Sequence, residues 1–229
     1  MKFKFIAAFF MLFVLVNFHA QKIQKLIYDL NGAIEIYTEN FLLKVDKKGN
    51  SFIISPYNFS GTTDYFDNYQ EQYNYGKIKN IGDITVEYWN VSDERDARYG
   101  KVKRIGNVEV DYWTSLNYES EKFGRIKNIG EITFDYYKKD GFDTENEGKI
   151  KSIGNVFIEY WTDMSDKAKF GKLKSFGSVK LDYYNDYYGD KLKFGKLKSV
   201  VGNTGKIQVR AEFGFSFNGN KNSSSSVLY

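Results

Sequence analysis

One sequence unit recurs six times in this chain, and each copy begins with a glycine followed by a basic residue. The first five copies are GKIKNIGDITVEYW from Gly76, GKVKRIGNVEVDYW from Gly100, GRIKNIGEITFDYY from Gly124, GKIKSIGNVFIEYW from Gly148 and GKLKSFGSVKLDYY from Gly171. A sixth, incomplete copy starts at Gly195, and the spacings are 24, 24, 24, 23 and 24 residues. Such a period is typical of repeat proteins, in which neighbouring units bury one another's apolar surface.

Each unit contains two short runs in which polar and apolar residues alternate, the pattern of a half-buried β-strand. In the first unit these runs are Lys77–Lys79 and Asp83–Tyr88. β-Branched and aromatic residues dominate them, as strands prefer, and the only proline of the chain, Pro56, precedes the repeats. We therefore expect an all-β fold with two strands per unit.

The glycine in the middle of each unit predicts a hairpin turn. A three-residue loop Asn80–Gly82 would set Lys79 opposite Asp83 and Ile78 opposite Ile84, with the glycine in the left-handed region. The apolar residue before the glycine would then fold over the rim of the buried face. The predicted turn glycines are Gly82, Gly106, Gly130, Gly154 and Gly177.

Charge decides between two arrangements of these strands. In a parallel solenoid, Lys77, Lys101 and their equivalents would stack about 4.8 Å apart, and like charges directly opposite one another are destabilising. In an antiparallel meander each lysine-bearing strand lies between two strands that carry acids. We therefore predict a curved antiparallel meander of tandem 24-residue repeats. The alternatives are a parallel β-solenoid and an outer-membrane β-barrel, whose strands need about 9–11 residues.

The segments outside the repeats divide the rest of the chain. Residues 1–20 combine Lys2 and Lys4 with an apolar run and predict a cleaved signal peptide, hence export to the periplasm, the cell surface or the medium. Residues 21–74 predict a β-rich capping segment, 75–210 the six-copy region, and 211–229 a C-terminal strand and flexible tail. No stable membrane span is expected after cleavage, because no second apolar run of about 20 residues follows.

Composition excludes several kinds of chemistry from the mature chain. Removing Lys2 and Lys4 from the 33 basic residues leaves 31 basic against 29 acidic residues. This near balance does not indicate a nucleic-acid partner, which would require a strongly basic surface. The single histidine, His19, lies in the signal peptide, and the chain has no cysteine. Neither a Ser-His or Cys-His couple nor the usual zinc site is therefore expected. We predict no cofactor, no metal site and no catalytic residue.

Two sets of side chains recur once per unit and need an explanation. The acids Glu87, Asp111, Asp135, Glu159 and Asp182 resemble the carboxylates of a glycosidase, but a motif repeated in five units indicates cross-strand pairing rather than a single active site. Alternation places an aromatic residue of each unit on the polar face, where a row of rings would stack on a glycan. These speculative ligand-binding residues are Trp89, Trp113, Tyr137, Trp161 and Tyr184.

The function we expect is that of an exported, non-enzymatic β-repeat protein with a structural, adhesive or surface-interaction role. The partners we consider are a polysaccharide or another protein of the cell envelope. A glycan-binding module that uses the aromatic row is the first alternative, and an outer-membrane barrel is the second.

Overall fold

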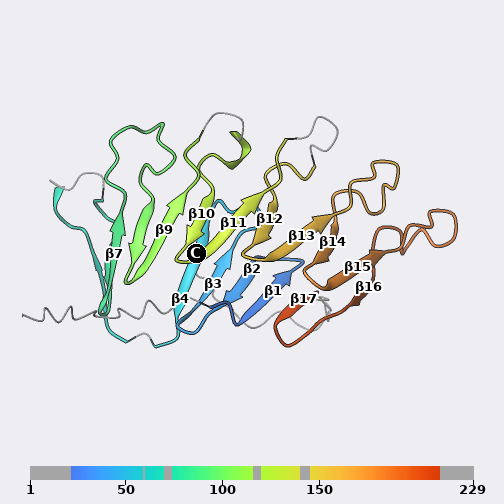
Figure 1. The fold of residues 1–229 in the computed structure, drawn as a ribbon, viewed down its shortest axis with the longest axis horizontal. Coiled ribbons are helices and arrows are strands. Elements are labelled where there is room, and N and C mark those ends of the chain that lie inside the picture. Colours follow the sequence, from blue (N-terminus) through green and yellow to red (C-terminus); the bar gives the residue numbers. More distant parts are fainter. Residues whose placement is uncertain (1–21, 59, 70–73, 116–119, 140–144, 212–229) are drawn as a thin grey trace, which may run out of the picture.

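The structure, a computed structural model, describes residues 22–58, 60–69, 74–115, 120–139 and 145–211. The predicted signal peptide, residues 1–20, and all but the first residue of the predicted C-terminal strand and tail, 211–229, lie outside these ranges. The described chain folds into one long sheet of 12 strands and a smaller sheet of five (Figure 1).

The long sheet is an antiparallel meander, as the charge argument predicts, and the parallel solenoid is excluded. Each strand pairs with its neighbours in the sequence, from β5 at one edge to β16 at the other. Its strands are β5 (Thr63–Tyr65), β6 (Ile78–Ile81), β7 (Ile84–Tyr88), β8 (Val102–Ile105), β9 (Val108–Tyr112), β10 (Ile126–Ile129), β11 (Ile132–Tyr136), β12 (Ile150–Ile153), β13 (Val156–Tyr160), β14 (Leu173–Phe176), β15 (Val179–Tyr183) and β16 (Leu197–Val201). Each complete unit thus gives a shorter strand followed by a longer one.

The predicted three-residue hairpin loop is wrong. Ile81 lies directly opposite Ile84, and Asn80 opposite Thr85, so the turn contains only two residues, Gly82 and Asp83. The turn glycines adopt positive φ angles, for example 57° at Gly82 and 54° at Gly154. The backbone of a residue with a Cβ rarely adopts such a φ angle, which explains the glycine in each turn.

A β-bulge explains why an apolar residue, isoleucine in the first four units and Phe176 in the fifth, stands immediately before each turn. Between β7 and β8, Glu87 faces Arg104 but Tyr88 faces Val102, so Lys103 is an extra residue. Because of this extra residue, Val102 and Ile105 point to the same face although they are three positions apart. The same shift recurs between the later units. The isoleucine therefore belongs to the strand, and in the central units it is fully buried, as Ile129 and Ile153 show.

The second sheet covers the apolar face of the meander. It has the order β17-β1-β2-β3-β4 and consists of β1 (Lys25–Asp29), β2 (Ile34–Tyr37), β3 (Phe41–Val45), β4 (Phe52–Pro56) and β17 (Ile207–Arg210). Its inward residues, among them Leu26, Ile34 and Leu43, form one core with Ile129, Ile153 and Phe176 of the long sheet. Residues 22–56 thus cover the long sheet over its central and C-terminal strands. The apolar residues of β6, and Ile84 and Tyr88 of β7, are only half-buried.

The turn between β3 and β4 links the two sheets directly. The carbonyl oxygen of Gly49 accepts a hydrogen bond of 3.0 Å from the amide of Ile126, and that of Lys47 accepts one of 3.0 Å from Ile150. The turn therefore provides partners for backbone groups near the bulges of β10 and β12.

The sixth copy lacks the hairpin turn. Val201 stands at the position of the turn glycine, and β16 continues through it instead of reversing. The chain then reaches the other sheet, where β17 pairs with β1 in parallel. The guanidinium of Arg210 anchors this strand through hydrogen bonds of 2.9 Å to Asp29 and 3.0 Å to Glu35.

Candidate functional site

The five predicted aromatic residues occupy the same place in successive units. Each is the first residue after the longer strand, at the start of the loop that leads to the next unit. The backbone of Trp89 extends the pairing of its strand, because its amide donates to the carbonyl of Lys101 at 3.0 Å. The rings consequently follow one another across the long sheet.

Basic side chains cover the rings of this aromatic row. The guanidinium of Arg98, from the following loop, lies 4.8 Å from the centre of the Trp89 ring, and the ammonium group of Lys103 lies 5.6 Å from it. These are cation–π distances. The same pair of contacts recurs at Trp113 with Lys122 and Lys127, and at Trp161 with Lys169 and Lys174.

The polar atoms of the row also bind the neighbouring unit. The indole N–H of Trp89 donates to the carbonyl of Val110 at 3.3 Å, and that of Trp113 to the carbonyl of Phe134 at 3.4 Å. The hydroxyl of Tyr137 donates to the carbonyl of Ile158 at 2.8 Å. Four of the five rings are half-buried, and only Tyr184 is exposed. This aromatic row therefore joins one unit to the next, and most of it offers a glycan little free ring surface.

In four of the six copies, the residue after the repeat glycine is a lysine that makes a second link between units. The ammonium group of Lys149 donates to the carbonyl of Gly171 in the following unit at 2.9 Å, and it lies 4.8 Å from the ring centre of Tyr160. Lys77, Lys101 and Lys172 make the equivalent contacts with Gly100, Gly124 and Gly195. Burial lowers the pKa of these three lysines, since a low-dielectric environment disfavours a charge.

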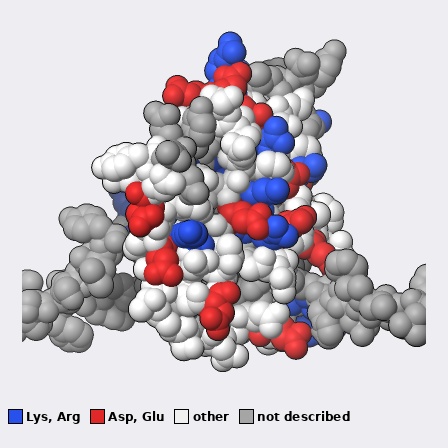
Figure 2. Space-filling model, turned by 90° about the vertical axis from the view of Figure 1, so that its left-hand side faces the viewer, with Lys and Arg blue, Asp and Glu red and all other residues white. Residues whose placement is uncertain are grey.

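The recurring acids lie beside basic groups. Glu87 contacts Arg104 at 2.6 Å, and Asp111 contacts Lys127 at 3.4 Å, each across to the first strand of the next unit. Asp182 contacts both Lys169, at 2.7 Å, and Lys198, at 3.4 Å. On the face at the β5 end, basic and acidic side chains are likewise interspersed rather than gathered by sign (Figure 2).

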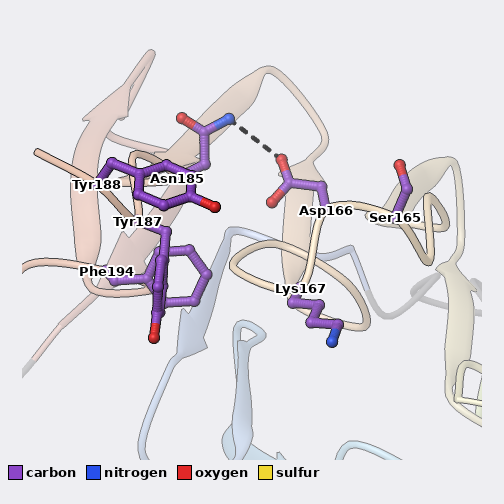
Figure 3. Close-up of a pocket in the computed structure, with 7 residues that line it drawn as sticks. All are labelled: Ser165, Asp166, Lys167, Asn185, Tyr187, Tyr188 and Phe194. Atoms are coloured by element: carbon purple, nitrogen blue, oxygen red, sulfur yellow. Dashed lines mark hydrogen bonds between the residues drawn. The ribbon is translucent and has the colours of Figure 1, made fainter. Parts of the chain in front are cut away.

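A cleft that the sequence did not predict lies between two neighbouring loops, residues 162–170 and 184–194 (Figure 3). It has a volume of about 600 Å³ and is lined by Ser165, Asp166, Lys167, Asn185, Tyr187, Tyr188 and Phe194. Tyr188 is 92% exposed and Tyr187 52% exposed. The Tyr187 ring meets the rings of Tyr188 and Phe194 edge to face, with centres 5.6 Å and 5.3 Å apart.

The polar wall of this cleft faces its aromatic wall. The side-chain amide of Asn185 donates to a carboxylate oxygen of Asp166 at 3.3 Å, so the two loops are joined (Figure 3). Each loop is tightened by side-chain-to-backbone bonds, such as Asp186 accepting from the amide of Tyr188 at 3.0 Å. The one signal in the sequence was the Tyr187-Tyr188 pair, two adjacent aromatic residues between Asp186 and Gly189.

Among the residues that the structure describes, no cluster of three or more acidic, histidine or cysteine side chains is arranged to hold a metal ion. Over the same ranges, no helix has the length and apolar character needed to cross a membrane. Comparisons with protein-family models, curated proteins and solved structures gave no match to this chain.

Proposed function

We propose that this chain is an exported, non-enzymatic β-repeat protein with a structural or adhesive role. We further propose that it contacts its partner through the loops that connect one unit to the next. The observation that carries the proposal is that most of the repeated side chains contact the neighbouring unit. The lysines bind glycine carbonyls, two of the tryptophans bind strand carbonyls, and the acids bind lysine or arginine.

This use of the repeated side chains argues against a catalytic role for them. A general acid or a nucleophile needs an environment that sets its pKa apart from that of its equivalents. Here Glu87, Asp111 and Asp182 all lie in the same kind of ion pair with a basic residue of the next unit. Such a series is suited to holding strands in register, because each pair stabilises the sheet by about 0.2–1 kcal/mol.

The loops differ from unit to unit, and several of them carry exposed apolar residues. Tyr69 and Tyr75 form a stacked pair in the first loop, with ring centres 4.4 Å apart. Met164 and Leu192 are 57% and 79% exposed in two later loops. Loops held by a rigid scaffold are the usual place for binding residues, and exposed aromatic side chains are typical anchors of an interface.

Glycan binding is the second candidate, and the cleft beside Tyr188 favours it. An exposed ring offers a flat apolar face to a sugar, while Asp166 and Asn185 offer acceptors and donors for hydroxyl groups. The aromatic row that the sequence predicts is less suited to this role, since cations already lie over the rings of Trp89, Trp113 and Trp161.

The experiment is a binding assay of the purified protein against a polysaccharide panel and isolated cell envelopes. We expect the double variant Tyr187→Ala/Tyr188→Ala to weaken binding at least tenfold. Ile53→Ala, which changes an exposed residue of β4 in the smaller sheet, should leave binding unchanged. If the unmodified protein binds a polysaccharide specifically but does not bind the cell envelopes, glycan binding is favoured over the first candidate. Turnover of a substrate that a single carboxylate substitution abolishes would refute the non-enzymatic proposal.

A further inference from the structure

The two edges of the long sheet are incomplete in complementary ways. In the order of the meander, shorter and longer strands alternate, and each unit pairs one of each through a hairpin. The sheet nevertheless begins with β5, which occupies the place of the second strand of a unit, and ends with β16, which occupies the place of the first strand. Neither edge strand has a hairpin partner within the described residues.

β5 corresponds to the second strand of a unit whose first strand is missing. The amide of Gly82 donates to the carbonyl of Thr62 at 2.8 Å, just as that of Gly106 donates to Thr85 in the next unit. The amide of Phe66 donates to Lys77 at 2.9 Å, as Trp89 does to Lys101. Thr62-Thr63-Asp64-Tyr65-Phe66 therefore corresponds to Thr85-Val86-Glu87-Tyr88-Trp89.

β16 corresponds to the first strand of a unit whose second strand is missing, because Val201 replaces the turn glycine. It pairs with β15 through Leu181 opposite Val200 and Asp182 opposite Ser199, in the register of the other units. Among the described residues, no strand pairs with its other side. Lys198 of β16 does not mark a protected edge, since Lys151 of β12 and Lys174 of β14 occupy the same position in strands that are paired on both sides.

Two side chains at these edges lack the partners that their equivalents have. In the fifth unit the ammonium group of Lys172 lies 5.1 Å from the Tyr183 ring centre, and the Tyr183 hydroxyl donates to the carbonyl of Leu173 at 3.0 Å. The equivalents at the edges are Tyr65, which is 55% exposed, and Lys196, which is also exposed. Neither side chain has a hydrogen bond or ion pair with another described residue.

We propose that β16 of one copy pairs with β5 of a second copy in the hairpin register, so that copies of this chain join head to tail into one continuous meander. Ser199 would lie opposite Thr62 of the next copy, as Asn80 lies opposite Thr85 within one unit. Lys196 would cover the ring of Tyr65, and the carbonyl of Leu197 would accept from its hydroxyl. A contact between two different edges leaves one of each edge free, so the assembly is an open chain rather than a closed dimer.

The first test measures the mass of the purified full chain over a range of protein concentrations by light scattering and sedimentation. We expect the mass to rise with concentration through dimers to longer species. The single variants Thr63→Pro and Val200→Pro, each of which removes an outward-facing amide from one edge, should be monomeric, whereas their mixture should give a discrete heterodimer. Circular dichroism and thermal unfolding establish that both variants fold. A protein that stays monomeric at every concentration, or dimers that persist in both single variants, would overturn the proposal.

The second test traps the predicted register with cysteines, which the natural chain lacks. Because the main chain of Thr62 faces β6, Thr62 and Ser199 would form a non-hydrogen-bonded pair about 4.5 Å apart at Cα, within the range of a disulfide. A mixture of Thr62→Cys and Ser199→Cys proteins should yield a heterodimeric disulfide under mild oxidation. Thr63→Cys with Ser199→Cys is the control, because adjacent residues point to opposite faces. Equal yields in the two mixtures would contradict the register.

Discussion

Lys172 illustrates how a single residue type ties the repeats together. Its ammonium group donates to the carbonyl of Gly195 in the next unit and lies over the ring of Tyr183 in its own. Burial lowers the pKa of Lys172, yet the carbonyl and the ring both interact with its charged form. A lysine at this position therefore contacts both its own unit and the next one.

We expect Lys172→Met to lower the free energy of unfolding by about 1.5–3 kcal/mol, the usual value of a hydrogen bond to a charged group. Methionine keeps most of the apolar stem, so the loss reports on the ammonium group. Lys196→Met is the matched control, because Lys196 has no following unit in its own chain, and it should change little in dilute solution. Denaturant unfolding measures both, and equal losses would show that the contact with Gly195 does not stabilise the fold.

Gly49 lies in the turn that joins the two sheets, with φ of 66°. A Cβ at this position would overlap the hydroxyl of Tyr136, which donates to the carbonyl of Ile126 at 2.7 Å. Gly76 has a similar φ of 76°, but open space lies around the position of its Cβ.

Gly76→Ala should therefore cost only the left-handed strain, about 1–2 kcal/mol. We expect Gly49→Ala to cost at least about 2 kcal/mol more, because the Tyr136 hydrogen bond is lost or the turn moves away from β10. Thermal unfolding of the two variants side by side provides the measurement. A similar loss of stability in both would mean that the turn yields to the extra methyl group.

At the scale of the strand, apolar burial determines the register of the hairpin. The three-residue loop would pair Lys79 with Asp83, and an opposite-charge pair stabilises a sheet by about 0.2–1 kcal/mol. The two-residue turn with a bulge instead places both apolar residues of the shorter strand inward, and full burial of an isoleucine is worth about 1.5–3 kcal/mol. A prediction based on strict alternation overlooks this solution, because a bulge leaves no separate mark in the sequence.

The bulge makes the residue before the turn a core position in the covered units. We expect Ile153→Ala, at a site with 0% exposure, to cost about 2–5 kcal/mol. The equivalent change Ile81→Ala, in a unit where this residue is only half-buried, should cost less than half of that. Equal costs in equilibrium unfolding would contradict the view that the second sheet, rather than the hairpin itself, buries this row.

At the scale of the whole molecule, the repeats were predictable, but the way in which the smaller sheet pairs and covers them was not. The 24-residue period and the alternation of charge are local signals, and they were sufficient for the meander. The pairing of β1 with β17, for example Tyr28 with Val209, joins distant parts of the chain and has no periodic signature. The sequence also placed Trp113 on the polar face but did not show that Lys122 of the following loop would cover its ring, because the loops differ in sequence from unit to unit.

The two-layer fold buries tyrosines from several units, and this makes its stability sensitive to alkaline pH. Burial raises the pKa of Tyr112, Tyr136 and Tyr160, and it raises that of Tyr183 to about 12. Because the folded state holds these protons more tightly than the unfolded state, their stabilisation is complete below pH about 10 and is lost as the pH rises toward 12. For Tyr183 alone, two pH units correspond to roughly 2–3 kcal/mol.

Absorbance of tyrosinate and circular dichroism, followed together from pH 9 to 12.5, should therefore show that the buried tyrosines ionise only as the β signal is lost. Tyr183→Phe, which removes one of these buried hydroxyl groups, should reduce the rise in absorbance that accompanies the loss of the β signal. If all 19 tyrosines ionised in one step near pH 10 while the β signal persisted, the hydroxyl groups between the two sheets would be open to water, and the packing of the smaller sheet on the meander would have to be looser than described.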